Sequence, residues 1–161
     1  MFIGINYTGM QGELRVRDCC SEQRSKRQGS YLQSVFLHLT DHIQGCLEDV
    51  KNIHAWLVSN YTIAPQDVQI LTDDQKDPAK RPTKQNILSA LQWLVKDAAP
   101  GDSFFLHYSG HGGSVADADG DELDGKDETI VPLDYGTAGQ ITDDELNTAL
   151  CKNLPEGAQV P

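Results

Sequence analysis

Short apolar runs alternate with amphipathic stretches along this chain, and this alternation is the strongest constraint on its fold. Buried strands are predicted at residues 2–7, 68–72, 103–108 and 129–133. Helices are predicted at 48–59, at 84–98, and in a last short segment opened by Asp143 and Asp144. Strands that alternate with helices predict an α/β fold, with a mostly parallel sheet and helices packed on its faces. The length of 161 residues suits one domain over residues 1–161.

The apolar spacing also predicts which side of each helix faces the sheet. Thr83 is the expected N-cap of the helix 84–98. The residues expected on the inner faces are Val50, Ile53, His54, Leu57 and Val58 in the first helix, and Ile87, Leu88, Leu91, Leu94 and Val95 in the second.

Charge and hydropathy exclude several classes of function. The formal net charge of -11 argues against a nucleic-acid-binding protein or one that binds anionic membranes. No apolar run approaches the roughly 20 residues of a membrane span, and the N-terminus reads as a strand rather than a signal peptide. Four cysteines without a CxxC pair do not suggest structural zinc. We therefore expect an intracellular protein with reduced thiols.

The segment FFLHYSGHGG, residues 104–113, places a histidine on a glycine-rich turn at the end of a predicted strand. Functional groups gather at the carboxyl ends of the strands in such sheets. The imidazole of His111 titrates near neutral pH, which suits a general acid or base. A purely structural histidine is the alternative. His107, inside the strand, is expected in the core or in support of the site.

The acidic segment between residues 117 and 128 has partial EF-hand spacing. Asp117, Asp119, Asp121 and Glu128 fall at loop positions 1, 3, 5 and 12. Position 6 is Glu122, although an EF-hand needs glycine there for a sharp turn. The segment also lies between two strand-like stretches, so an EF-hand is disfavoured.

Three motifs, FFLHYSGHGG, DGDELDGKDETIVPLD and ITDDEL, together resemble the p20 region of type I metacaspases, which are caspase-like cysteine peptidases. FIGINY, DVQILTDDQ and the segment from Pro82 to Gly113 fit the same pattern. The resemblance covers nearly the whole chain except residues 16–44. It implies a caspase-like sandwich (the caspase–hemoglobinase fold) that is incomplete at the C-terminus.

The resemblance implies a His/Cys dyad in which His111 is the general base. Gly112 and Gly113 become candidate donors to the oxyanion, and Asp49 a residue of a pocket for substrate Arg or Lys. The family's nucleophile lies in a D-x-C-H-S-G motif, about 50 residues after the histidine. We therefore expect this chain to stop just short of it and to be inactive alone. Cys46 is expected in buried packing, and the other cysteines are Cys19, Cys20 and Cys151.

The resemblance further implies activation by low-affinity Ca²⁺ bound through Asp127, Asp143 and Asp144. Helix capping is the alternative role of Asp143 and Asp144. The expected protein is part of a calcium-dependent cysteine endopeptidase that cleaves peptides or proteins after Arg or Lys. It is expected to be monomeric and cytoplasmic, with the nucleus as a further location. The alternative is a non-catalytic calcium-binding or interaction protein, a pseudoenzyme.

Residues 16–44 do not fit the family pattern, in which the segment ending at Arg15 continues directly at Gly45. The stretch is locally basic and holds two adjacent cysteines. Codons for Val16-Arg17 can contain a splice donor, and those for Ile43-Gln44 can end in an acceptor. A retained intron or a gene-prediction error is one hypothesis, and a real surface insertion is the alternative.

Overall fold

A three-stranded parallel sheet forms the centre of the computed structural model, which describes residues 1–7, 45–117, 120 and 122–158. Its strands are β1 (Phe2–Gly4), β2 (Ile70–Thr72) and β3 (His107–Ser109), in the order β2-β1-β3. Phe2 pairs with Ile70 on one side and with His107 on the other. The bond from Ile5 N to Ser109 O, at 3.0 Å, extends the pairing of β1 with β3.

A second, antiparallel sheet has the order β4-β5-β6 and contains Gly112–Ala116, Lys126–Ile130 and Ile141–Thr142. The strand expected at 129–133 is therefore wrong in its bounds and in its sheet. Its apolar residues Val131 and Leu133 are buried after the end of β5. The hairpin was missed because the glycines of β4 are poor strand formers.

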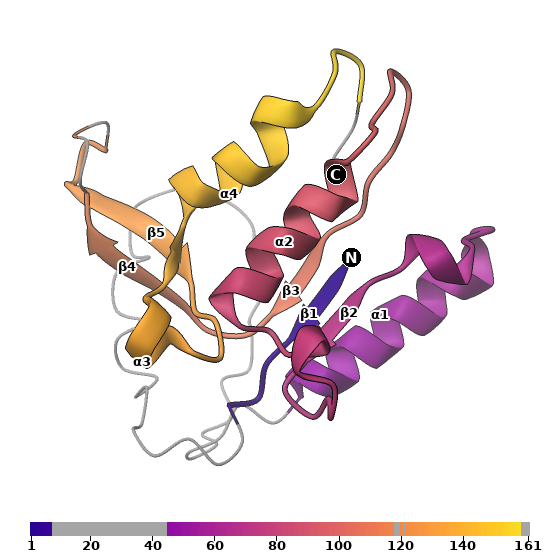
Figure 1. Cartoon of the computed structure of the whole chain (residues 1–161), viewed down its shortest axis with the longest axis horizontal. Coiled ribbons are helices and arrows are strands. Elements are labelled where there is room, and N and C mark those ends of the chain that lie inside the picture. Colours follow the sequence, from indigo (N-terminus) through magenta and orange to yellow (C-terminus); the bar gives the residue numbers. More distant parts are fainter. Residues whose placement is uncertain (8–44, 118–119, 121, 159–161) are drawn as a thin grey trace, which may run out of the picture.

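Helices cover both faces of the parallel sheet (Figure 1). Side chains alternate between the two faces along a strand. Phe2 packs with Val50 and Leu57 of α1 (Cys46–Asn60). Ile3 and Ile5 belong to the larger core on the other face, which includes Ile87 and Leu91 of α2 (Lys84–Val95) and residues of α4 (Asp143–Leu150). The side chains of the two cores that are less than 2% exposed include Ile3, Ile5, Ile87, Leu91, Ile141 and Val50.

The helix boundaries follow local capping chemistry. The Thr83 hydroxyl accepts a hydrogen bond from Asn86 N, as the sequence predicts. Thr142 and Glu145 form a capping box at the start of α4, so capping does not depend on Asp143 or Asp144. The helix α2 ends at Val95 rather than residue 98, because Lys96 is extended and Asp97 has a positive φ of 61°.

The mixed α/β class, the parallel sheet and the helices on both of its faces are confirmed. Val58 is 47% exposed, so its expected place on the inner face of α1 is wrong. The sequence predicts residues 103–108 as a central strand, but β3 lies at an edge of the described sheet. Residues 16–44 lie outside the described residues, and their origin stays a prediction. Among the described helices, none is long and apolar enough to span a membrane.

Gly4 allows β1 and the first turn of α1 to approach closely, and this contact generates a prediction. A Cβ atom at Gly4 would lie 2.8 Å from both the Cys46 carbonyl oxygen and Val50 Cγ2. We expect Gly4→Ala to lower the free energy of unfolding by about 1–3 kcal/mol, because overpacking displaces the helix. Urea unfolding measures this change.

Gly136→Ala in α3 (Tyr135–Ala138) is the matched control for Gly4→Ala. A Cβ atom at Gly136 would meet nothing within 4 Å. The control is expected to leave stability unchanged or to raise it by up to about 1 kcal/mol, because alanine is the better helix former. Equal stability of the two variants would contradict the close packing at Gly4.

Candidate active site

His111 lies on the turn that leaves β3 and enters β4, at the carboxyl end of the parallel sheet. The side chain is partly buried, and its ring centroid lies 4.8 Å from that of Tyr7, which follows β1. The turn requires glycine at position 110, because a Cβ atom there would lie 2.6 Å from the Tyr108 hydroxyl. Burial lowers the pKa of His111 below its ordinary value. The site therefore favours a neutral imidazole that can accept a proton.

The two candidate oxyanion donors differ in their backbone environment. The register pairs Gly112 with Ile130 and Gly113 with Thr129, and Val131 N donates to His111 O at 3.1 Å. Hydrogen-bonded and non-hydrogen-bonded pairs alternate along an antiparallel ladder. Gly113 N–H therefore points at β5, whereas Gly112 N–H points away from it. Gly112 is the better placed of the two candidates to bind another group.

A hydrogen bond from Ser109 connects Asp49 to the end of the strand that precedes His111. The Ser109 hydroxyl, two residues before His111, donates to Asp49 Oδ2 at 2.8 Å. Asp49 is exposed in the first turn of α1. The structure thus brings a solvent-accessible carboxylate and a partly buried imidazole to the end of the same strand. Sequence reasoning singled out both residues but missed Ser109, which connects them.

The two described cysteines differ in their environment. Cys46 is 3% exposed and packs at the start of α1, as expected. Burial raises the pKa of its thiol, which disfavours the reactive thiolate, although a hydrogen bond with Ser109 opposes this shift. Cys151 is exposed in the 3-10 turn after α4. Cys19 and Cys20 lie outside the described residues.

His107 fits its expected supporting place within the sheet. It is partly buried on β3, with its ring centroid 6.4 Å from that of Phe2. Its Nε2 atom is buried and makes no hydrogen bond to the described residues. His107 therefore packs within the fold, whereas His111 lies on the turn beyond the strand.

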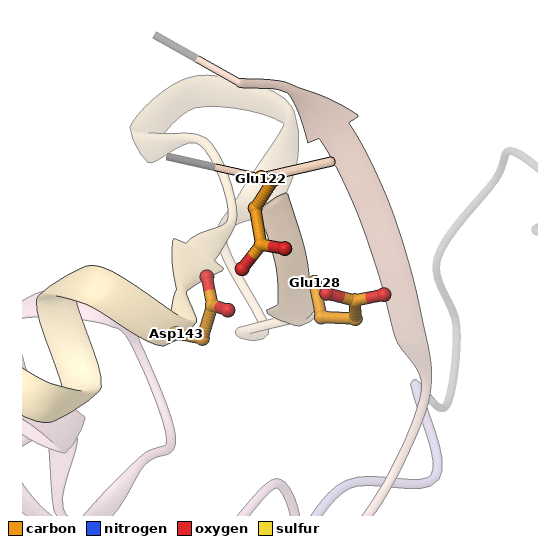
Figure 2. A group of neighbouring side chains, drawn as sticks. All are labelled: Glu122, Glu128 and Asp143. Carbon is orange, nitrogen blue, oxygen red and sulfur yellow. The ribbon is translucent and has the colours of Figure 1, made fainter. Parts of the chain in front are cut away.

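An acidic cluster lies where the hairpin loop, the middle of β5 and the start of α4 meet (Figure 2). Carboxylate oxygens of Glu122, Glu128 and Asp143 all lie within 4.8 Å of one another. These residues come from the hairpin loop, from β5 and from the start of α4, so the fold assembles them from separate segments. Three hard oxygen donors suit Ca²⁺ chemically.

The carboxylates predicted to bind calcium are only partly brought together. Asp143 belongs to the cluster in Figure 2, but Asp127 and Asp144 do not. Asp127 is 5% exposed and neighbours Glu128 on β5, so their side chains take opposite faces of the strand. Asp144 is exposed in the first turn of α4. From the sequence, Glu122 is only the residue that breaks the EF-hand spacing, and Glu128 is a candidate ligand only within that spacing.

The loop between β4 and β5 is shaped by Asp117. Its carboxylate accepts hydrogen bonds from Gly120 N at 2.7 Å and from Glu122 N at 3.2 Å. The loop connects two strands, which confirms the argument against an EF-hand. Asp119 and Asp121 lie outside the described residues.

A separate pocket of about 610 Å³ lies at the opposite edge of the parallel sheet, beside β2. Its wall includes His54, Val58, Ile70 and Lys80. It contains none of the residues that the sequence predicts for the site. The candidate catalytic and substrate-binding residues therefore lie at the strand ends and not in this pocket.

A family model described as "Metacaspase, peptidase C14 domain" matches residues 1–161. The chain is 44% identical over 160 residues to Metacaspase-1 of Ajellomyces capsulatus and to Metacaspase-1 of Coccidioides immitis. It is 43% identical over 160 residues to Metacaspase-1B of Neurospora crassa. Each alignment covers 99% of this chain but only 37%, 28% and 31% of the relative, respectively. The chain thus spans about a third of the length of these relatives.

A similar solved structure is that of a protein from Geobacter sulfurreducens. It has a TM-score of 0.52 and 31% sequence identity to this chain, and the match covers 71% of this chain and 38% of the other. The resemblance extends to the fold as well as to the sequence.

The burial of His111 generates a prediction about stability and pH. Its folded-state pKa lies below the unfolded value, so the unfolded chain binds a proton more readily. The free energy of unfolding should therefore fall as pH drops through about 6.5, the ordinary histidine pKa. We expect His111→Gln to make this fall shallower. Chemical unfolding at pH 7.5 and 5.5 would test it, and identical falls in both proteins would contradict it.

Proposed function

The chain belongs to the metacaspase family of C14 peptidases, and from this premise we propose that it carries the general base and a substrate-binding aspartate of a cysteine endopeptidase. The observation that carries the proposal is the convergence of His111 and Asp49 at the end of β3. Ser109 Oγ donates to Asp49 at 2.8 Å, and His111 follows on the next turn. A base and an acidic recognition group thus share one edge of the sheet.

The proposed reaction is peptide-bond hydrolysis through an acyl-enzyme. A cysteine sulfur attacks the scissile carbonyl carbon while His111 accepts the thiol proton. His111 then donates this proton to the leaving amine as the C–N bond breaks. Water attacks the thioester with His111 again as base, and the acid product and the free thiol are released. The lowered pKa of His111 supports its role as the proton acceptor.

The family resemblance supplies the nucleophile, which follows the histidine by about 50 residues in caspase-like peptidases. That position lies outside the described residues. Gly112 N–H is the proposed oxyanion donor, because it points away from β5. Gly113 is the less favoured candidate, because its register position opposite Thr129 directs its N–H at β5.

Cleavage after Arg or Lys is proposed from charge complementarity. Asp49 is exposed and can meet a basic side chain at the end of the sheet. The formal net charge of -11 attracts cationic peptides to the molecule as a whole. Monomeric state and a cytoplasmic location stay predictions from the sequence.

Calcium is the proposed activating ion, held by the cluster of Glu122, Glu128 and Asp143. The donor set consists of carboxylates from separate segments, which suits Ca²⁺ at low affinity. Bound Ca²⁺ would neutralise the mutual repulsion of these side chains. Asp127 and Asp144, the remaining ligands implied by the family resemblance, are kept as candidates for the experiment.

The peptidase proposal is tested by the activity of the protein encoded by the complete transcript. Full-length cDNA sequencing comes first, because it defines that protein and shows whether residues 16–44 are translated. We expect hydrolysis of short Arg or Lys peptide substrates, and a loss of about 10²–10⁴-fold in kcat/KM on His111→Gln, the usual contribution of a general base.

His54→Gln is the matched control for the peptidase assay, because His54 lies on α1 and lines the distant pocket. It should retain activity close to that of the wild type. Asp49→Asn should lower kcat/KM for cleavage after Arg and Lys, while His111 still acts as the general base. Absence of hydrolysis with calcium binding intact would instead favour the non-catalytic calcium-binding alternative.

The calcium proposal predicts that Ca²⁺ stabilises the folded protein. Millimolar Ca²⁺ should raise the melting temperature, because an ion that binds only the folded state stabilises it. Glu128→Gln and Asp143→Asn should each shift the midpoint of this effect about tenfold or more to higher calcium. Thermal melts over a calcium series measure the change.

Asp67→Asn is the control for the calcium series, because Asp67 is exposed in the turn Pro65–Asp67 and outside the cluster. Asp127→Asn distinguishes the cluster from the ligand set implied by the family, because Asp127 belongs only to the second set. If it shifts the midpoint while Glu128→Gln does not, the set implied by the family replaces the cluster in Figure 2.

A further inference from the structure

The backbone of His111 meets Val131 where the β4-β5 ladder would gain another rung. The register pairs Gly112 with Ile130, so His111 and Val131 are the next residues in line. In a regular ladder these two residues would exchange both of their N–H and C=O groups. One bond forms directly, from Val131 N to His111 O at 3.1 Å. The second bond of the pair, from His111 N to Val131 O, is replaced by hydrogen bonds through a side chain.

The hydroxyl of Tyr7 is inserted between His111 N–H and the Val131 carbonyl. His111 N donates to Tyr7 Oη at 3.2 Å, and Tyr7 Oη donates to Val131 O at 2.6 Å. The hydroxyl thus accepts one bond and donates one, which uses its single proton fully. The backbone N–H of the candidate base is consequently held by a residue at the end of the parallel sheet.

The Tyr108 hydroxyl bridges the same two residues in the opposite direction, between Val131 N–H and the His111 carbonyl. Its hydroxyl lies 2.7 Å from His111 O and accepts a 3.3 Å hydrogen bond from Val131 N. The 3.2 Å contact to Val131 O is longer, so the single proton of Tyr108 is best used toward His111. Tyr7 Oη and Tyr108 Oη lie 3.4 Å apart.

Tyr7 adopts an unusual backbone conformation at this place. Its φ is +56°, in the left-handed region that side chains other than glycine rarely adopt. Such a conformation costs free energy and persists only where surrounding contacts fix it. The bonds to His111 and Val131, and the ring contact with the imidazole, are such contacts.

We propose that Tyr7 and Tyr108 are positioning residues that hold His111 for its role as general base. The inference rests on the proposed function, because it assumes that the His111 imidazole moves a proton. The two hydroxyls hold the N–H and the carbonyl of the residue that carries this imidazole. They also connect the end of the parallel sheet to the start of the antiparallel one. A displacement of about 1 Å at a reacting group can cost on the order of 100-fold in rate.

Amide hydrogen exchange can distinguish the two bridges, and this measurement does not require enzymatic activity. Tyr7→Phe removes the acceptor of His111 N–H, so we expect exchange at His111 to rise about tenfold or more. Tyr108→Phe leaves Val131 N–H with its direct bond to His111 O. Exchange at Val131 should therefore change by less than about threefold in that variant.

Kinetics in the protein encoded by the complete transcript provide the second measurement. Tyr7→Phe should lower kcat about tenfold or more while KM changes less than about twofold, because the substrate-binding Asp49 is untouched. Tyr61→Phe is the matched control, since Tyr61 is 58% exposed beyond the end of α1. It should match the wild type in exchange at His111 and in kcat.

Two outcomes would overturn the positioning role. One is unchanged exchange at His111 together with unchanged kcat in Tyr7→Phe. The other is faster exchange throughout β1 and α2 with equal losses in folded protein and activity, which describes a general structural contact. If His111→Gln remains fully active, the proposed function fails, and the exchange result at His111 still decides whether the hydroxyl bridge exists.

Discussion

Burial of β1 on both of its faces is the constraint on which the rest of the structure depends. Phe2 packs against α1, whereas Ile3 and Ile5 pack against the core formed with α2 and α4. Both edges of β1 are paired as well, with β2 and with β3. Because each large apolar side chain buried there contributes on the order of 1.5–3 kcal/mol, the strand fixes the positions of the helices and of its two neighbours.

This arrangement brings three loops together at the carboxyl ends of the parallel strands. The Asn6 backbone N–H donates to Asp73 Oδ2 at 3.1 Å, and the Asn6 side chain accepts from Cys46 N at 3.1 Å. The loops after β1 and β2 are thereby tied to the start of α1. Asp49 follows one turn later in α1 and accepts a hydrogen bond from Ser109, the last residue of β3. The candidate site thus follows from where the strands end.

The elements found from sequence are those with a strong local signal. The period of apolar residues identified α1 and α2, and Thr83 marked a helix start. The hairpin was missed because Gly112 and Gly113 carry no side chain to mark a strand. Likewise, His111 stands out by residue type and Asp49 follows from the family resemblance, but the bridges through Tyr7 and Ser109 depend on contacts between distant segments. No local pattern encodes such contacts.

The β4-β5 hairpin connects the two chemical features of the chain. His111 and its tyrosine hydroxyls lie where β4 begins, whereas Glu128 lies at the middle of β5, opposite Ser114, and Glu122 lies in the hairpin loop. A two-stranded hairpin is only marginally stable by itself, and here its partner β6 is two residues long. The three carboxylates of the cluster lie within 4.8 Å of one another, so a bound cation would relieve their mutual repulsion. The register between β4 and β5 is continuous from the pair Ala116 and Lys126 to the pair Gly112 and Ile130, so a single ladder supports both the acidic cluster and the turn that carries His111.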